Sequence, residues 1–277
     1  MSATVTAAAG TAPALDLLLT PEAASLRLGE AFAHYDEHGW ARLGPVVSES
    51  WLSALRERAD QIMLGKVVHE GLFFQHDSDS GSYNDLPRGV GYQGPSLRYR
   101  KIEKLERDPL FRDVLENPLF ERIARARIEG NVVLYRAVLF TKAASGGTRL
   151  PWHQDGGSFW GLSRDPSLQI WTALDDAPME SGCVEVIPGS HKDGLATPLG
   201  GVIPDDVAER NRAEERALSL PARAGESLLI HNHLWHRSGT NRTQAPRRAL
   251  TACLMSEEIR CVRRKRAPRT FVPLFRK

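Results

Sequence analysis

The segment LPWHQDGG (residues 150–157) places a histidine and an aspartate two positions apart, between a tryptophan and a pair of glycines. Alternate side chains of a β-strand share a face, so His153 and Asp155 point the same way if this segment is extended. Two histidines and one carboxylate on one face of an octahedron leave three positions open, as in non-haem Fe(II) oxygenases. An H-x-D pattern alone is more often a solvated loop, so a metal site requires a third ligand.

The candidates for that third ligand are four histidines in the second half of the chain, His191, His231, His233 and His236. Three of them lie in LLIHNHLWHRSGTNRTQAPRRAL (residues 228–250). His231 and His233 share strand parity, so spacing alone would select them as a ligand pair. The residues by themselves leave this choice open.

The composition indicates a globular protein. The chain has 277 residues, of which 42% are hydrophobic and 25% charged, and its formal net charge of +2 says little about partners. The cysteines Cys183, Cys253 and Cys261 are scattered and form no C-x-x-C pair, which favours reduced thiols and a cytoplasmic location over a disulfide framework or zinc ribbon. We find no secretory signal pattern and no apolar run near the ~18 residues of a membrane span.

The first half of the chain is predicted to be helical. Apolar residues recur at helical spacing over residues 21–39, 49–64 and 108–126. A short strand or an extended segment is expected at WARLGPVV (residues 40–47). Residues 66–100 are rich in Gly, Ser, Asp and Pro but contain aromatics, which is typical of a working loop or of disorder.

From residue 131 the pattern changes to short apolar runs separated by turn residues. This spacing predicts a β-sandwich or barrel rather than alternating βα units. We therefore expect the following organisation: a flexible tail (1–20) and one domain (21–277), comprising a helical part (21–130), a β core (131–258) and a basic C-terminal segment (259–277).

Several segments together resemble the phytanoyl-CoA dioxygenase family of Fe(II)/2-oxoglutarate oxygenases. They are EHGWARL, WHQDGG, WTALDDAPMESGCVEVIPGSHK and HRSGTNRTQAPRRAL, which span roughly residues 30–260 in an order and spacing that agree with the family. The resemblance implies a mainly β fold: a double-stranded β-helix core, also described as a jelly roll or cupin-like, with supporting N-terminal α-helices.

Residue by residue, the resemblance implies that His153, Asp155 and His236 are the catalytic iron ligands. Arg247, eleven residues past His236, matches the arginine that pairs with the distal carboxylate of 2-oxoglutarate, and Ser238 matches the hydroxyl that assists it. A planar guanidinium meets a carboxylate at two points, which suits this task.

Competing assignments remain for each of these positions. His233 is the main rival ligand, His231 is expected in the wall, and His191 belongs to a structural PGSHK turn. Arg248 competes with Arg247, since alternation sends the two arginines to opposite faces of a strand. A further residue, Trp171, occupies a strand where the family often places an aromatic beside the cosubstrate, although a core tryptophan is an equal alternative.

The activity that the resemblance implies is hydroxylation of a small molecule with Fe(II), 2-oxoglutarate and O2, releasing succinate and CO2; ascorbate can assist in vitro. Related halogenases have a small residue where Asp155 stands, so halogenation is not expected. Two alternatives are a metal-dependent isomerase or epimerase without oxygen chemistry and a non-catalytic binding protein. Arg247 weighs against the first alternative, and the intact ligand set weighs against the second.

The substrate pocket is expected from residues 70–95 and 158–165. Its candidate apolar walls are Phe73, Phe74, Phe140, Phe159 and Trp160.

The substrate is expected to be a diffusing small molecule, such as a specialised metabolite, an amino-acid derivative or an acyl thioester. Arg98, Arg100 and Lys101 could meet an anionic group, although solvated surface charges are the favoured interpretation. The basic run 260–277 is expected to pack Phe271 and Phe275 on the body, with no nucleic-acid or membrane partner. The oligomeric state is not predicted.

Overall fold

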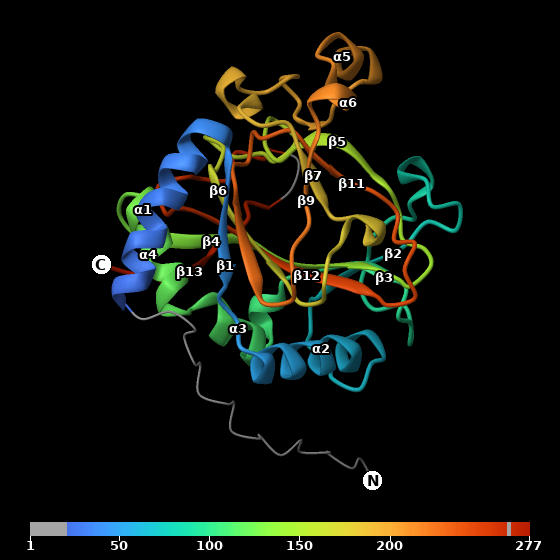
Figure 1. Ribbon diagram of the computed structural model, residues 1–277. Coiled ribbons are helices and arrows are strands. Elements are labelled where there is room, and N and C mark those ends of the chain that lie inside the picture. The colour runs from blue at the N-terminus through green and yellow to red at the C-terminus, as the bar shows by residue number, and fades with distance from the viewer. Residues whose placement is uncertain (1–20, 265–266) are drawn as a thin grey trace.

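The structure is a computed structural model that describes residues 21–264 and 267–277 (Figure 1). The flexible tail predicted for residues 1–20 lies outside the described residues. Two antiparallel sheets face one another, and the helices of the N-terminal half lie against the outer side of the larger one (Figure 1).

The larger sheet contains the long strands of the chain. In spatial order its strands are β1 (Trp40–Pro45), β10 (Glu226–Ile230), β6 (Leu168–Ala173), β12 (Arg247–Ser256), β4 (Val132–Lys142), β3 (Tyr99–Glu103) and β2 (Phe73–His76), with β13 (Val272–Phe275) also pairing with β4. Both faces of β6 and β12 are buried, which explains why their sequences are nearly continuous apolar runs.

The smaller sheet contains shorter strands. Its order is β8 (Gly201–Val202), β5 (Leu150–Gln154), β11 (His236–Ser238), β7 (Val184–Val186) and β9 (Leu218–Leu220). Two facing antiparallel sheets with these crossovers form a jelly roll, so the predicted double-stranded β-helix is confirmed.

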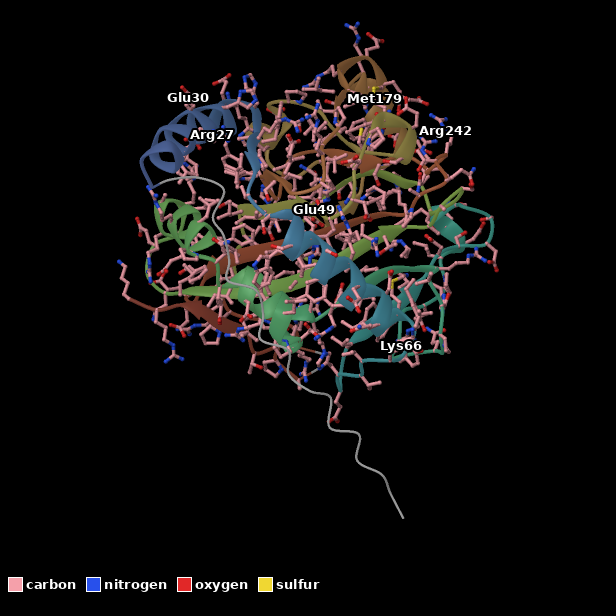
Figure 2. All side chains as sticks on the ribbon, turned by 60° about the horizontal axis from the view of Figure 1, so that its bottom comes forward. Arg27, Glu30, Glu49, Lys66, Met179 and Arg242 are labelled. Atoms are coloured by element: carbon pink, nitrogen blue, oxygen red, sulfur yellow. The ribbon has the colours of Figure 1, made fainter. Side chains whose placement is uncertain are left out.

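The helices α1 (Pro21–His38), α2 (Glu49–Met63), α3 (Pro109–Leu115) and α4 (Pro118–Arg127) cover the larger sheet. The short helices α5 (Asp205–Arg210) and α6 (Ala213–Arg216) lie beside the smaller sheet instead, where their apolar side chains pack with Trp152 of β5 (Figure 1). Figure 2 shows α2, between the labelled Glu49 and Lys66, lying across the strands. Side chains of α2, α3 and α4 form the main hydrophobic core with the outward side chains of β4, β6 and β12. Among the described residues, no helix combines the length and apolar character that a bilayer span requires.

The first predicted helix ends as expected at Gly39. Its backbone N–H bonds the carbonyl of Tyr35 at 2.7 Å, and its φ of 79° is one that glycine adopts without strain. A Cβ added there would lie 2.5 Å from the His191 ring, so a side chain would also clash.

The single helix predicted over residues 108–126 is wrong, because two helices, α3 and α4, occupy this segment. Pro118 lacks an N–H and disfavours helical geometry in the residue before it. That residue, Asn117, instead caps α4, since its side-chain oxygen accepts a hydrogen bond from the Leu119 N–H at 2.7 Å.

The segment 66–100, predicted as a loop, adds regular structure to the sheet. It contributes β2 and the start of β3, which pair with each other and extend the sheet beyond β4. Their inner face becomes one wall of the interior cavity.

Replacing Asn117 by Ala is expected to lower the free energy of unfolding by about 1 kcal/mol, because the α4 cap is lost. Asn117→Asp keeps an acceptor at the same place and serves as the matched control. Urea denaturation measures both variants, and an Asn117→Ala variant as stable as the wild type would contradict the capping role.

Candidate metal centre and cosubstrate pocket

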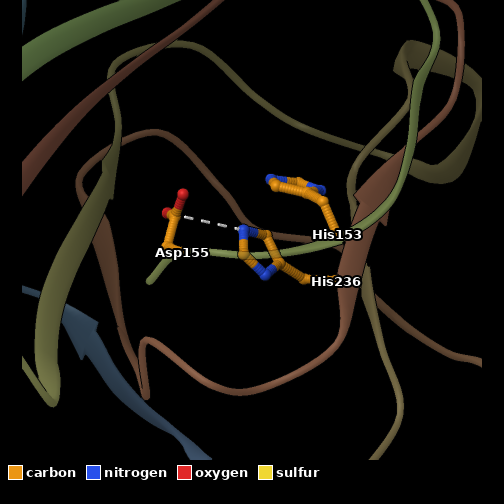
Figure 3. A group of neighbouring side chains, drawn as sticks. All are labelled: His153, Asp155 and His236. Atoms are coloured by element: carbon orange, nitrogen blue, oxygen red, sulfur yellow. Dashed lines mark ion pairs between the residues drawn. The ribbon is translucent and has the colours of Figure 1, made fainter. Parts of the chain in front are cut away.

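The two histidines of the predicted triad lie directly opposite each other on neighbouring strands. β5 and β11 pair antiparallel with His153 in register with His236, and their ring centroids are 3.9 Å apart. Asp155 follows the end of β5 and turns its carboxylate toward the rings (Figure 3). One ligand atom from each of the three residues lies within 4.8 Å of the others. The structure therefore brings together three potential ligands that are 83 positions apart at most.

Backbone carbonyls fix the orientation of both rings. The Nδ1 atom of His153 lies 2.9 Å from the Pro151 carbonyl oxygen, and Nδ1 of His236 lies 2.8 Å from that of Leu234. Because a carbonyl oxygen only accepts, each Nδ1 carries the proton and each Nε2 presents its lone pair. Metal-binding histidines commonly have such a second hydrogen bond, and here residues two positions earlier supply it.

The Asp155 carboxylate is held from the facing sheet. Its Oδ2 accepts hydrogen bonds from Arg136 Nη2 on β4 at 3.0 Å and from Gln169 Nε2 on β6 at 2.9 Å. Burial alone would raise the pKa of Asp155, but Arg136 and the two histidines together bring this pKa below its usual value. The carboxylate is therefore ionised, as a metal ligand must be.

The ring of His153 is kept neutral. Burial, followed by the neighbouring His236, lowers the pKa of His153 to about 3. A neutral imidazole beside an ionised carboxylate is the donor set that suits a divalent transition metal. His153 and Asp155 consequently fit an iron ion in the protonation states that they already have.

The rival histidines have other partners. His233 Nε2 lies 2.9 Å from Asp165 Oδ2, and the His231 ring packs against that of His191, with centroids 5.0 Å apart. These three histidines do not line the cavity that contains His236. The geometry thus separates His236 from the alternatives that spacing alone left open.

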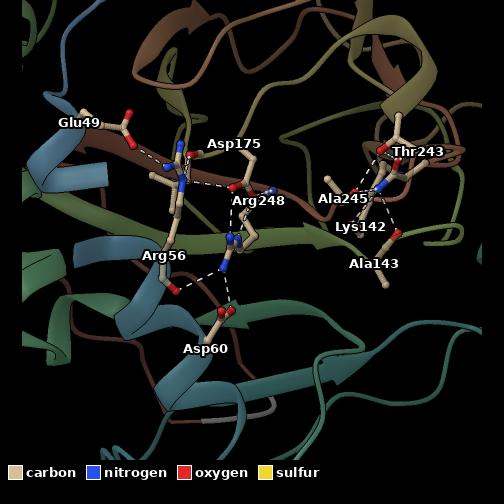
Figure 4. A network of polar contacts seen from close by, with 11 residues as sticks. Glu49, Arg56, Asp60, Lys142, Ala143, Asp175, Thr243, Ala245 and Arg248 are labelled. Atoms are coloured by element: carbon tan, nitrogen blue, oxygen red, sulfur yellow. Dashed lines mark hydrogen bonds and ion pairs between the residues drawn. The ribbon is translucent and has the colours of Figure 1, made fainter. Parts of the chain in front are cut away.

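Arg247 and Arg248 face opposite sides of β12. Arg248 points to the helices, where its guanidinium pairs with Asp175 at 2.8 Å and with Asp60 of α2 at 2.7 Å (Figure 4). Arg247 points into the cavity and donates one hydrogen bond to the Gly182 carbonyl at 2.9 Å.

The Arg247 guanidinium has unused binding capacity. Among the described residues it forms no ion pair, and its buried Nε has no hydrogen-bond partner. Burial lowers the pKa of Arg247 to about 10, so it still carries its charge at neutral pH. A buried, unpaired cation is costly, and an incoming carboxylate would offset that cost.

The cavity between the two sheets has a volume of about 320 Å³. The predicted residues that line it are His153, Asp155, His236, Arg247, Ser238, Trp171, Phe73, Phe140, Phe159 and Trp160. Phe159 is 67% exposed at the rim, whereas Trp160 is buried and stacks on Tyr135.

The expectation that Phe74 forms a pocket wall is corrected. Phe73 and Phe74 are neighbours on β2, so they point to opposite faces of the sheet. Phe74 belongs to the main hydrophobic core and packs against the rings of Tyr92 and Tyr99.

Sequence reasoning missed several polar residues of the cavity. Arg136, Lys142 and Gln169 all line it, and Arg136 contacts the Asp155 carboxylate directly. Strand parity was the available signal, because Arg136 and Lys142 share the face of β4 that carries Phe140.

The favoured surface interpretation of Arg100 and Lys101 is also wrong. Both line the cavity and are largely buried, whereas Arg98 is 59% exposed and pairs with Asp79 at the surface. The reason is that β3 lies inside the larger sheet between β2 and β4, where sequence alone suggested a loop.

A double-stranded β-helix with two histidines and one aspartate gathered beside a buried arginine defines the class of 2-oxoglutarate-dependent non-haem iron oxygenases. Within that class, the chain belongs to the phytanoyl-CoA dioxygenase (PhyH) family, whose model matches residues 35–249.

Curated relatives agree with this membership. Phytanoyl-CoA dioxygenase domain-containing protein 1 of Danio rerio is 32% identical over 159 residues, which is 54% of each protein, so the match spans about half the length of that relative. L-proline trans-4-hydroxylase of Streptomyces griseoviridis is 26% identical over 249 residues, covering 82% of this chain and 85% of that enzyme.

Solved structures share the fold. The non-heme alpha ketoglutarate dependent epimerase SnoN from nogalamycin biosynthesis matches with a TM-score of 0.66 and 21% identity, covering 91% of this chain and 98% of that one. EctD from S. alaskensis, solved with 2-oxoglutarate and 5-hydroxyectoine, matches with a TM-score of 0.64 and 18% identity over 87% of this chain and 77% of that one. At these identities the likeness concerns the fold.

The two arginines of β12 are expected to differ in their effect on stability. Arg248→Gln removes one partner of a largely buried ion-pair network and should lower the free energy of unfolding by about 3 kcal/mol. Arg247→Gln should cost clearly less, because Arg247 has no ion pair to lose among the described residues. Urea denaturation without added metal or keto acid compares them, and equal losses would contradict the assignment of their two faces.

Proposed function

We propose that this chain is an Fe(II)/2-oxoglutarate-dependent dioxygenase that hydroxylates a small-molecule substrate and releases succinate and CO2. The observation that carries the proposal is the presence, in one cavity, of the three potential metal ligands and the unpaired guanidinium of Arg247. Membership of the PhyH family supports the same reaction class.

The metal is proposed to bind the Nε2 atoms of His153 and His236 and the carboxylate of Asp155. Both Nδ1 atoms are occupied by backbone carbonyls, so Nε2 is the free donor of each ring. Arg136 and Gln169 hold the Asp155 carboxylate in place, which favours a preformed site over one assembled by the ion.

Arg247 is proposed to bind the distal carboxylate of 2-oxoglutarate. It is buried and cationic, and its Nε has no protein partner, which leaves donors for a carboxylate. Ser238 on β11 and Trp171 on β6 line the same cavity and are proposed to contact the keto acid with a hydroxyl and an aromatic face.

When bound, iron and the keto acid together supply the oxidative chemistry by activating dioxygen. The contribution of the protein is to position the substrate and to exclude water. The apolar side chains of Phe73, Phe140 and Trp160 line the cavity and would hold a substrate beside the three ligands.

Two other functions fit these residues less well. An isomerase or epimerase without oxygen chemistry would leave Arg247 as an unpaired buried cation with no task. A non-catalytic binding protein would not need an ionised carboxylate beside two oriented imidazoles. Consumption of oxygen and 2-oxoglutarate by the iron-loaded protein, followed with an oxygen electrode, tests the proposal against both.

Replacing Asp155 by Ala is expected to remove tight Fe(II) binding and to abolish succinate formation, since the only carboxylate of the proposed ligand set is lost. His233→Gln is the matched control, because His233 pairs with Asp165 and is predicted to leave iron binding unchanged. Anaerobic equilibrium dialysis measures bound iron directly. Full iron binding by the Asp155→Ala protein, or its loss in His233→Gln, would refute the assignment.

Replacing Arg247 by Ala is expected to weaken 2-oxoglutarate binding by roughly 30-fold or more, because a desolvated carboxylate loses its charged partner. Arg242→Ala, which removes an exposed arginine (Figure 2), should leave the affinity unchanged. Calorimetric titration of the metal-loaded protein without oxygen gives both dissociation constants. Equal affinities for the two variants would remove Arg247 from the cosubstrate site.

A further inference from the structure

The cavity wall carries many positive charges and few negative ones. Among the lining residues that the structure describes, Asp155 is the only carboxylate. The basic side chains that line the cavity are Arg100, Lys101, Arg136, Lys142, Arg237 and Arg247. The excess of positive charge is larger than one bound keto acid neutralises, because the proposed iron ion adds two further positive charges.

Three of these six basic residues have a counter-charge in the structure, and a fourth, Arg247, has a proposed one. The assigned pairs are Lys101 with Glu103 at 2.6 Å, Arg136 with Asp155 at 3.0 Å, Arg237 with Glu185 at 2.8 Å, and Arg247 with the distal carboxylate proposed above. Two cations are left over, Arg100 and Lys142.

Neither remaining cation forms an ion pair within the described part of the chain. Arg100, 9% exposed, donates to Gln75 Oε1 at 2.8 Å, and Lys142, 6% exposed, donates to the Thr148 carbonyl at 2.7 Å. Burial lowers the pKa of both groups, and that of Lys142 falls well below its usual value, so Arg100 holds its charge more firmly than Lys142. Asp77 favours the charged form of both groups without forming an ion pair with either, and its Oδ1 accepts two hydrogen bonds from Thr148. Arg100 is therefore a buried guanidinium in the cavity wall that has no ion-pair partner among the described residues.

The two leftover cations lie on neighbouring strands, close enough for Arg100 to act on the charge of Lys142. Lys142 on β4 is in register with Arg247 on β12, which places it beside the proposed keto-acid pocket. Arg100 lies on β3, which is one strand farther from Arg247 than β4 is and which pairs with β2, the strand that carries Phe73. Of the two leftover cations, Arg100 is therefore the one nearer to the aromatic wall and farther from the proposed keto-acid pocket.

We propose that the substrate carries an anionic group and that Arg100 binds this group, while Phe73 and Phe140 contact an apolar body. This inference rests on the proposed function, since it assigns Arg247 to the keto acid. A guanidinium with one hydrogen bond to Gln75 keeps further donors for a carboxylate or a phosphate. The cavity volume of about 320 Å³ is at the lower end for ligand sites, so the part of the substrate inside it is small.

The test uses three probes of similar shape: phenylacetate, phenyl phosphate and the neutral phenylacetamide. Each is titrated by calorimetry into the full-length protein loaded with Fe(II) and saturating 2-oxoglutarate without oxygen. We expect an anionic probe to bind about 10-fold or more tightly than the amide, since a hydrogen bond to a charged group exceeds a neutral one by at least that factor. The tighter of the two anions identifies the substrate class as carboxylates or phosphate esters.

Three variants locate the effect. Arg100→Gln should abolish the preference for the anion over the amide, whereas Arg100→Lys should keep part of it. Arg98→Gln removes an exposed arginine two residues away and should bind like the wild type.

Specific results would overturn the inference. These are equal binding of amide and anions by the wild type, no binding of either anion, or an unchanged preference in Arg100→Gln. Titration of 2-oxoglutarate into the Fe(II)-loaded wild-type protein, before any keto acid is added, distinguishes the two proposals. Failure to bind 2-oxoglutarate contradicts the proposed function, whereas failure of the anionic probes alone contradicts only the role of Arg100.

Discussion

The pairing of β5 with β11 is the constraint on which the site depends. Antiparallel register sets His153 directly opposite His236, and backbone carbonyls two residues earlier turn both rings the same way. A slip of one residue would send the His236 side chain to the other face of the smaller sheet and dismantle the triad. The site is therefore built from backbone hydrogen bonds first, and side-chain chemistry follows from them. Asp155 completes the set because the end of β5 brings it within reach of the facing sheet, where Arg136 holds it.

The two faces of the larger sheet have different roles: the outer face contributes to stability, and the inner face lines the cavity. Its outer face packs against the helices and contains most of the hydrophobic core, and Arg248 ties β12 to α2 on that side. Its inner face supplies the cavity with Arg136, Lys142 and Arg247. Because neighbouring side chains of a strand diverge, residues adjacent in sequence have unrelated tasks. The contrast between Arg247 and Arg248 follows from this geometry alone.

The basic side chains of the cavity lower the stability of the folded protein, because several of them are buried without a counter-charge. Buried cations without partners are unfavourable, and natural proteins retain such groups mainly at functional sites. In this chain the unpaired cations lie on strands β3, β4 and β12, all inside one rigid sheet, so their positions are fixed before any ligand arrives. Preorganised charges of this kind reduce the reorganisation that binding requires. The same imbalance links the proposed keto-acid pocket at Arg247 with the anionic-substrate site inferred at Arg100.

The sequence by itself determined the first two helices, the change to short strands after residue 131 and the candidate H-x-D ligand pair. Helical spacing, short apolar runs and the H-x-D pattern are features of neighbouring residues, and the family resemblance added the choice of His236. Tertiary structure alone decided which faces meet: it placed Arg100 in the cavity instead of at the surface, and Phe74 in the core. The alternation of side chains along one strand can be read from neighbouring residues. Which of the two faces lines the cavity depends on pairings between strands as far apart in sequence as β4 and β12. Those long-range hydrogen bonds leave no pattern in the local sequence. Only the folded chain therefore shows which charged side chains line the cavity and which of them are paired.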